Sequence, residues 1–189
     1  MIVRQPEERF PTAPEGSYAA VCVDEIDLGK VKSSFGGEET ERNMVRLVWQ
    51  IDEEMTDAEC QRHNVPEGTR YTIKQDYTAS LHEKAKLRQH LQSWRGRAFT
   101  QTELFGFDLE SVVGQPCMLS IIHVQGRKGG TFSNLESVMR PPKGMAAIIP
   151  VGYVRVKDRP ATAPAKKNSA PEEAPPTPNW SPADEDVPF

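Results

Sequence analysis

The order of hydrophobic patterns along residues 16–140 is the feature that most constrains the fold of this chain. A long β-rich stretch, "GSYAAVCVDEIDLG", comes first, and the strictly alternating runs "NMVRLVWQID" and "RYTIKQDYTAS" follow it. A helical pattern comes next, with Leu87, Leu91 and Trp94 at positions i, i+4 and i+7. Two more strand-like runs, "QPCMLSIIHV" and "TFSNLESVMR", enclose a glycine-rich turn. The patterns therefore predict three strands, a helix and a two-stranded hairpin.

Local signals set the boundaries of these elements. Acidic residues interrupt the first strand, which predicts a strong bend, and residues 30–42 are polar enough to predict a loop. The sequence from Ser80 to Glu83 fits a capping box, so we expect the helix to begin there and to end at Gly96. A second capping box, at residues 100–103, predicts a short helical turn.

This element order is that of an OB-fold. We therefore predict a mainly β domain over residues 14–156, a five-stranded Greek-key barrel with a helix between strands 3 and 4. The long bent first strand fits this barrel, because that strand must serve both of its sheets. Trp49 alternates with Val45, Leu47 and Ile51, so we assign it to the core and not to a binding surface.

The composition changes at residue 157. Residues 157–189 contain 8 of the 16 prolines, separated mainly by small and charged residues. Such a sequence cannot bury enough apolar surface to fold, so we predict a disordered Pro-rich linker over residues 157–183. An acidic tip, residues 184–189, follows, and residues 1–13 are expected to form a flexible N-terminus.

Charge and cysteine content narrow the function. The net charge of -4 predicts no global attraction to nucleic acid or membranes, so any nucleic-acid surface must be a local patch. Cys22, Cys60 and Cys117 form no CxxC motif. Cys22 and Cys117 lie in apolar runs, so we expect them to be buried thiols in a reducing compartment, the cytoplasm of a bacterial host cell, and Cys60 with His63 is at most half of a zinc site. We expect no signal peptide, no membrane span, no metal and no cofactor. No catalytic motif is present, so we predict that the protein is not an enzyme.

Binding is better supported than catalysis. In OB-folds, strands 2 and 3 bind single-stranded nucleic acid, between the loops that join strands 1 to 2 and 4 to 5. Cations there bind phosphates, and aromatic side chains stack on bases. Seven residues at these places are the predicted contacts for single-stranded DNA: Lys30, Lys32, Phe35, Arg46, Lys74, Arg127 and Lys128. Arg95 and Arg97, in "WRGRAF", either complement the helix dipole or contact the DNA backbone.

The last six residues, "DEDVPF", resemble the acidic tip of bacterial and phage single-stranded DNA-binding proteins. The stretches "SLHEKAKLRQHLQSWRGRAFT" and "GFDLESVVGQPCMLSIIH" resemble a family of phage and prophage replication-associated proteins that bind single-stranded DNA through an OB-fold. These resemblances imply a role in phage or prophage DNA replication and recombination. They also imply that replication or recombination proteins bind the tip, which consists of Asp184, Glu185, Asp186, Val187, Pro188 and Phe189. The tip's charge predicts competition with DNA for the basic groove.

Two alternatives remain open. The acidic net charge is compatible with a non-enzymatic OB-fold adaptor that binds proteins and little or no DNA. The carboxylates between Asp52 and Asp57 are compatible with a Mg²⁺-dependent nuclease, although a solvated acidic face is the simpler interpretation. Whether the protein forms a homo-oligomer, and whether it prefers DNA or RNA, stays open at this point.

Overall fold

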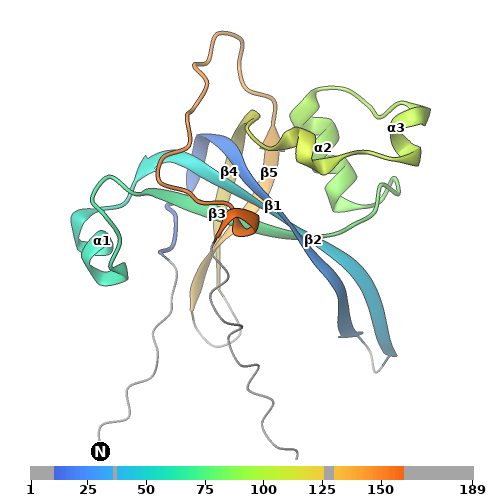
Figure 1. Ribbon diagram of the computed structural model, residues 1–189, viewed down its shortest axis with the longest axis horizontal. Helices are drawn as coiled ribbons and strands as arrows, with labels where there is room; N and C mark the ends of the chain where they lie inside the picture. Colours follow the sequence, from blue (N-terminus) through green and yellow to red (C-terminus); the bar gives the residue numbers. More distant parts are fainter. Residues whose placement is uncertain (1–10, 36–37, 126–129, 160–189) are drawn as a thin grey trace, which may run out of the picture. The chain divides into compact units, whose positions relative to one another are not determined.

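The computed structural model describes residues 11–35, 38–125 and 130–159. Its centre is a five-stranded antiparallel sheet with the strand order β3-β2-β1-β4-β5 (Figure 1). The strands are β1 (Gly16–Phe35), β2 (Glu38–Glu54), β3 (Arg70–Thr78), β4 (Pro116–Gln125) and β5 (Thr131–Met139). The helices are few and short: α1 (Asp57–His63), α2 (Lys86–Arg95), α3 (Gln101–Phe105), and the 3-10 turns η1 (Leu109–Val112) and η2 (Val156–Asp158). The prediction of a mainly β fold is confirmed.

The two edge strands of the sheet, β3 and β5, contact each other. No backbone pairing between them is present in the described residues, where the ladder pairs join β3 to β2, β2 to β1, β1 to β4 and β4 to β5. α2, α3 and η1 all lie between β3 and β4 in the sequence. The sheet therefore has the element order expected of an OB-like fold.

β1 is bent, as its interruption predicts. Its pairing with β2 shifts register between Cys22 and Asp24 and again between Asp27 and Gly29. Gly29 has a φ of 65°, which favours glycine, and its N–H donates to the Asp27 carboxylate at 2.7 Å. These bulges turn the outer half of the β1–β2 hairpin away from the rest of the sheet.

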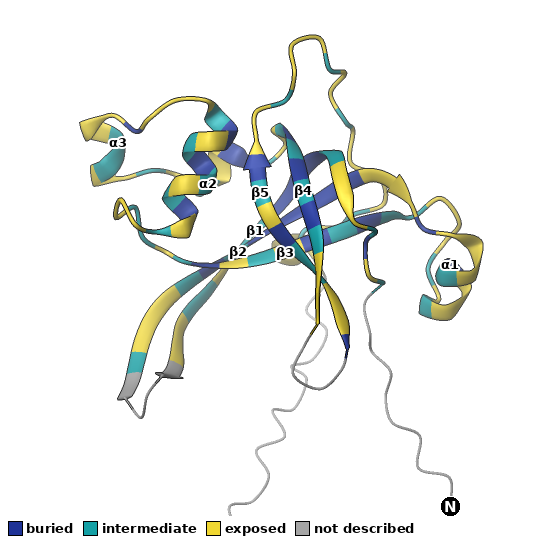
Figure 2. Ribbon diagram, turned by 180° about the vertical axis from the view of Figure 1, so that it is seen from behind, coloured by how far each residue is buried: buried dark blue, intermediate teal, exposed yellow. Residues whose placement is uncertain are grey.

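The prediction of a polar loop at residues 30–42 is wrong. β1 and β2 continue as a two-stranded ribbon that projects from the sheet, here called the arm (residues 29–35 and 38–44) (Figures 1 and 2). Solvent reaches both faces of such a ribbon, so its sequence carries no alternation of apolar and polar residues. In the arm, β1 and β2 are held together by backbone pairing and not by a buried face. The polar sequence of the arm therefore predicted a loop at a place where the chain forms strands.

The core lies on one face of the sheet, under α2. Val45, Leu47, Trp49 and Ile51 are all buried, which confirms that Trp49 belongs to the core. Its ring packs against that of Trp94, with 6.1 Å between centroids. Cys22 and Cys117 are buried on the same side, and burial raises the pKa of the Cys22 thiol to about 12.

The helix between strands 3 and 4 begins later than its capping box predicts. α2 starts at Lys86, and the Ser80 hydroxyl accepts instead from the His82 N–H at 3.2 Å, within a turn that precedes the helix. Gly96 ends α2 in the left-handed conformation, as predicted. The second capping box is confirmed, because the Thr100 side chain and the Glu103 side chain each accept from the other residue's backbone N–H.

Residues 148–156, here called the strap, return over the opposite face of β1 and β2 (Figure 1). Ile148 and Tyr153 pack there on a second, smaller apolar cluster, made by Val21, Val23 and Val48. The strap has no regular secondary structure over most of its length, and nothing in its sequence pattern predicted it.

Buried polar groups fix the strap. The carboxylate of Asp24, which is buried, accepts from the Tyr153 hydroxyl at 3.0 Å, from Arg155 Nε at 3.1 Å and from the Val156 N–H at 2.8 Å. The side chain of Gln50 exchanges two hydrogen bonds with the backbone of Val151. The hydrogen bonds of Asp24 and Gln50 to the strap satisfy polar groups that would otherwise be costly to bury.

Residues 11–15 run along β4 and β5. Ala13, the last residue of the predicted flexible N-terminus, is buried. Its carbonyl oxygen lies 2.9 Å from His123 Nε2 and accepts from the Ser133 hydroxyl at 2.7 Å. The predicted linker after residue 159 and the acidic tip lie outside the described residues.

Candidate nucleic-acid interface

Two hairpins extend toward the same side of the sheet and diverge from each other (Figures 1 and 2). One is the arm, and the other is formed by the described parts of β4 and β5. They correspond to the connections from strand 1 to 2 and from strand 4 to 5, which the sequence assigns to binding. The predicted contact residues can be located on them one by one.

The arm divides its cations between its two faces. Lys30 and Lys32 are exposed and lie opposite Asn43 and Glu41, while Arg42 lies opposite Val31, one position out of phase. Lys30 and Lys32 therefore share one face, and Arg42 belongs to the other. Lys32 Nζ is 3.9 Å from the Glu41 carboxylate, a weak exposed ion pair.

Phe35 ends β1 at the tip of the arm, where its backbone pairs with Glu38. Its side chain lies outside the described part of the structure. The stacking role predicted for Phe35 stays a prediction.

Arg46 and Lys74 lie on the same face of the sheet, beside Val48. The strap packs on Val48, so it covers part of this face. The guanidinium of Arg46 makes a two-pronged pair with Asp76, at 2.5 and 2.8 Å. The hydrogen bond from Arg46 lowers the pKa of Asp76, so the carboxylate stays charged and holds the guanidinium. Arg46 is therefore engaged within the sheet.

Arg127 and Lys128, predicted contacts in the β4–β5 turn, lie outside the described residues. Next to that turn the structure exposes an aromatic residue that the sequence analysis missed. Phe132 is 55% exposed, and Val124, opposite it on β4, is 38% exposed. The sequence could have indicated this exposure. Phe132 and the buried Leu135 are three positions apart on one strand, so their side chains lie on opposite faces, and Phe132 is on the outer one.

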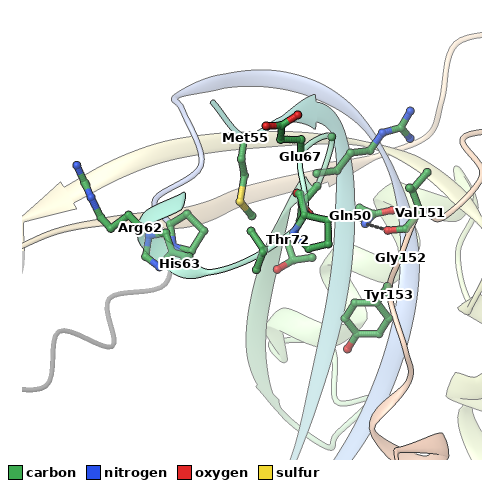
Figure 3. Close-up of a pocket in the computed structure, with 15 residues that line it drawn as sticks. Gln50, Met55, Arg62, His63, Glu67, Thr72, Val151, Gly152 and Tyr153 are labelled. Atoms are coloured by element: carbon green, nitrogen blue, oxygen red, sulfur yellow. Dashed lines mark hydrogen bonds between the residues drawn. The ribbon is translucent and has the colours of Figure 1, made fainter. Parts of the chain in front are cut away.

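A cavity of about 630 Å³ opens near the start of β3, beside the strap (Figure 3). Most of its walls are apolar, and include Met55, Val65 and Val151. Arg62 and Arg70 supply positive charge at the same place, and the guanidinium of Arg70 lies 3.0 Å from the Asp52 carboxylate. Such a site can accept a flat or aliphatic group next to a negative charge.

The acidic stretch between Asp52 and Asp57 does not form a cluster. Asp52 pairs with Arg70, and Asp57 lies in the first turn of α1. The described residues contain no group of three or more His, Cys, Asp or Glu side chains placed to hold a metal ion.

Comparison with known proteins found no family model that matches the chain and no curated protein that matches its sequence. The helices in the described part of the chain are all too short or too polar to span a lipid bilayer.

Proposed function

We propose that this protein binds single-stranded DNA without sequence preference, in phage or prophage DNA replication and recombination in the cytoplasm of a bacterial host. We further propose that its sheet closes as an OB-type barrel through β3 and β5, and that residues 184–189 recruit replication or recombination proteins. The tip and the body sequences support this through the resemblances described above.

The observation that carries the proposal is the pair of hairpins that extend toward the same side of the sheet (Figures 1 and 2). The arm presents Lys30, Lys32 and Arg42 to solvent, and the β4–β5 hairpin presents Phe132. Phosphate contacts from cations and base stacking on an exposed aromatic side chain are the two components of sequence-independent binding to single strands. The contact between the edge strands β3 and β5 supports closure of the barrel.

The test is fluorescence anisotropy of labelled oligo(dT) with the full-length protein, over a range of salt concentrations. We expect tight binding that weakens steeply with salt and that duplex DNA does not displace. An affinity for duplex equal to that for oligo(dT) would contradict the proposal.

A protein-binding adaptor is the second candidate, and the strap favours it. Ile149 is 76% exposed, and Val151, Val154 and Val156 are also exposed, so the strap presents four aliphatic side chains to solvent. Exposed apolar stretches of this kind are common at protein interfaces. If oligo(dT) does not bind at low salt, either to the full chain or to a chain without residues 184–189, the adaptor is the better assignment.

A further inference from the structure

We infer that a second cavity, at the C-terminal end of α2, binds a backbone phosphate of single-stranded DNA; this inference rests on the proposed function. The cavity has a volume of about 480 Å³. It is separate from the two hairpins, and lies where α2 ends beside the end of β5 (Figure 1). Three arginines and a single carboxylate line it: Arg95, Arg97, Arg140 and Glu103.

Arg95 is fixed in place by aromatic rings. Its guanidinium lies 4.7 Å from the centroid of Phe99 and 4.9 Å from that of Phe107. Nη2 donates to the Glu103 carboxylate, whereas the buried Nη1 has no hydrogen-bond partner among the described residues. A buried donor without an acceptor is rare in folded proteins, so the positive charge here is incompletely compensated.

Arg97 shares the same carboxylate. Its two terminal nitrogens donate to Glu103 at 2.9 and 2.7 Å. These hydrogen bonds, together with one from the Thr100 N–H, hold the pKa of Glu103 well below its usual range. One permanent negative charge therefore serves two guanidiniums, which leaves an excess of positive charge before Arg140 is considered.

Arg140 adds a third guanidinium, and no described residue forms an ion pair or hydrogen bond with its side chain. Its stem passes over Gly96, where a Cβ atom would come within 3.0 Å of Arg140 Cδ. Gly96 also has a φ of 67°, so glycine is required there both for the end of α2 and for the approach of Arg140. The helix dipole can account for Arg95 and Arg97, which close α2, but not for Arg140, which follows β5.

The segment that leads through α2 to this cavity is strongly cationic. Residues 81–97 contain five cations against the single acid Glu83, in a chain whose net charge is -4. The arm, by contrast, has three cations and three acids between residues 29 and 44. A polyanion that binds the hairpins is therefore attracted onward over α2.

A phosphate fits this site better than other anions do for two reasons. Guanidinium forks bind phosphate oxygens in pairs, and the phosphates of a bound strand repeat along its length, so they can follow the cations of residues 81–97. A carboxylate from an acidic peptide has the same attraction to a single fork, but it has no continuing polyanion to follow α2. The experiment must separate these two ligands.

The test compares Arg140→Gln with Lys143→Gln in the full-length protein. Both changes remove one exposed positive charge from the same segment, but Lys143 does not line the cavity. Binding to labelled oligo(dT) is measured over a range of salt concentrations. We expect Arg140→Gln to weaken binding several-fold and to reduce the slope of log K against log[salt] by about 0.7, the value for one phosphate contact on a single strand. Lys143→Gln should leave the slope unchanged, and Arg140→Lys should retain it.

Three results would overturn the inference. If the wild-type protein does not bind oligo(dT), the proposed function fails and the phosphate site fails with it. If the wild-type protein binds but Arg140→Gln and Lys143→Gln have equal slopes, only the phosphate site fails. If Arg140→Gln leaves DNA binding unchanged but weakens binding of a labelled peptide with the sequence DEDVPF, the cavity is a peptide site. Circular dichroism of each variant verifies that the fold is retained.

Discussion

At the scale of single residues, Phe132 is the exposed aromatic side chain that lies beside the β4–β5 turn. It presents 55% of its surface to solvent at the base of the β4–β5 turn, and its ring lies beside Gly130, where an added Cβ would come within 3.2 Å of it. A ring in this position contributes little to the core. It is available to stack on a base, which contributes about 1–3 kcal/mol for each base.

We therefore expect Phe132→Ala to weaken oligo(dT) binding about tenfold, with little change in stability. Anisotropy titrations at constant salt provide the measurement. Ile149→Ala is the control, because Ile149 is 76% exposed on the strap, outside both hairpins and outside the cavity at the end of α2, and should not affect affinity. Equal affinities for the two variants would exclude Phe132 from the interface.

His90 predicts a pH dependence of stability. Its Nδ1 lies 2.9 Å from the Tyr77 hydroxyl, and burial, with the nearby charge of Lys86, lowers its pKa to about 4. In the unfolded chain the imidazole has a pKa near 6.5. The unfolded state therefore binds the additional proton as the pH falls from about 6.5 to about 4, so the contribution to stability is complete above 6.5 and is lost across this window.

Urea denaturation at several pH values tests this, with His90→Gln as the non-titrating comparison. Between pH 7 and pH 4.5 the wild-type protein should lose on the order of 1 kcal/mol more than the variant, a value reduced for the partial exposure of the ring. If the two proteins lose stability in parallel, His90 does not cause the pH dependence.

At the scale of elements, the sequence predicts those parts that have one face in the core. Trp49 and its neighbours alternate because β2 is half-buried there, and Leu91 and Trp94 repeat with the period of a helix for the same reason. The arm has no buried face, because solvent reaches both of its sides, so its sequence shows no alternation of apolar and polar residues. The helix start was misplaced because the Ser80 hydroxyl can serve a turn as well as a cap.

The candidate interface was predictable to a lesser extent. Exposure of Lys30 and Lys32 follows from their polarity. The pairing of Arg46 with Asp76 depends on the register of β2 against β3, across 30 positions in the sequence, which no local pattern encodes. The strap is unpredictable for a similar reason, because it is held by Asp24 and Gln50 from distant strands.

At this scale we predict that the buried carboxylate of Asp24 holds the strap in place. Asp24→Ala leaves the donors of Tyr153, Arg155 and Val156 without their buried acceptor, so we expect a loss of about 3 kcal/mol in the free energy of unfolding. We also expect faster tryptic cleavage within the released strap, measured on gels at short times.

Glu110→Ala is the control for this change. Glu110 also pairs with Arg155, at 2.7 Å from Nη2, but at an exposed site where an ion pair contributes little to stability. Comparable destabilisation by the two variants would contradict this expectation, because it would mean that the exposed pair contributes as much to holding the strap as the buried carboxylate.

At the scale of the whole molecule, binding depends on where charge is placed, since the chain as a whole is acidic. Five of the last 18 residues are acids, and cations are absent among these 18, whereas residues 81–97 have an excess of four positive charges. Two oppositely charged segments on one chain attract each other at low salt, and the attraction decreases as the Debye length shortens. The acidic tip can therefore compete with phosphates for the same cations.

We expect deletion of residues 184–189 to raise the affinity for oligo(dT) at low salt, and the difference to disappear as salt increases. Replacing Asp184, Glu185 and Asp186 by their amides should have the same effect, because it removes the charge and retains the length. Phe189→Ala should not, because it retains all three acids; its expected effect is confined to the binding of partner proteins. Anisotropy titrations of the four proteins at two salt concentrations decide the matter. If Phe189→Ala alone raises the affinity, the tip competes through its aromatic ring and not through its charge; if no change raises it, the tip and the DNA do not share a site.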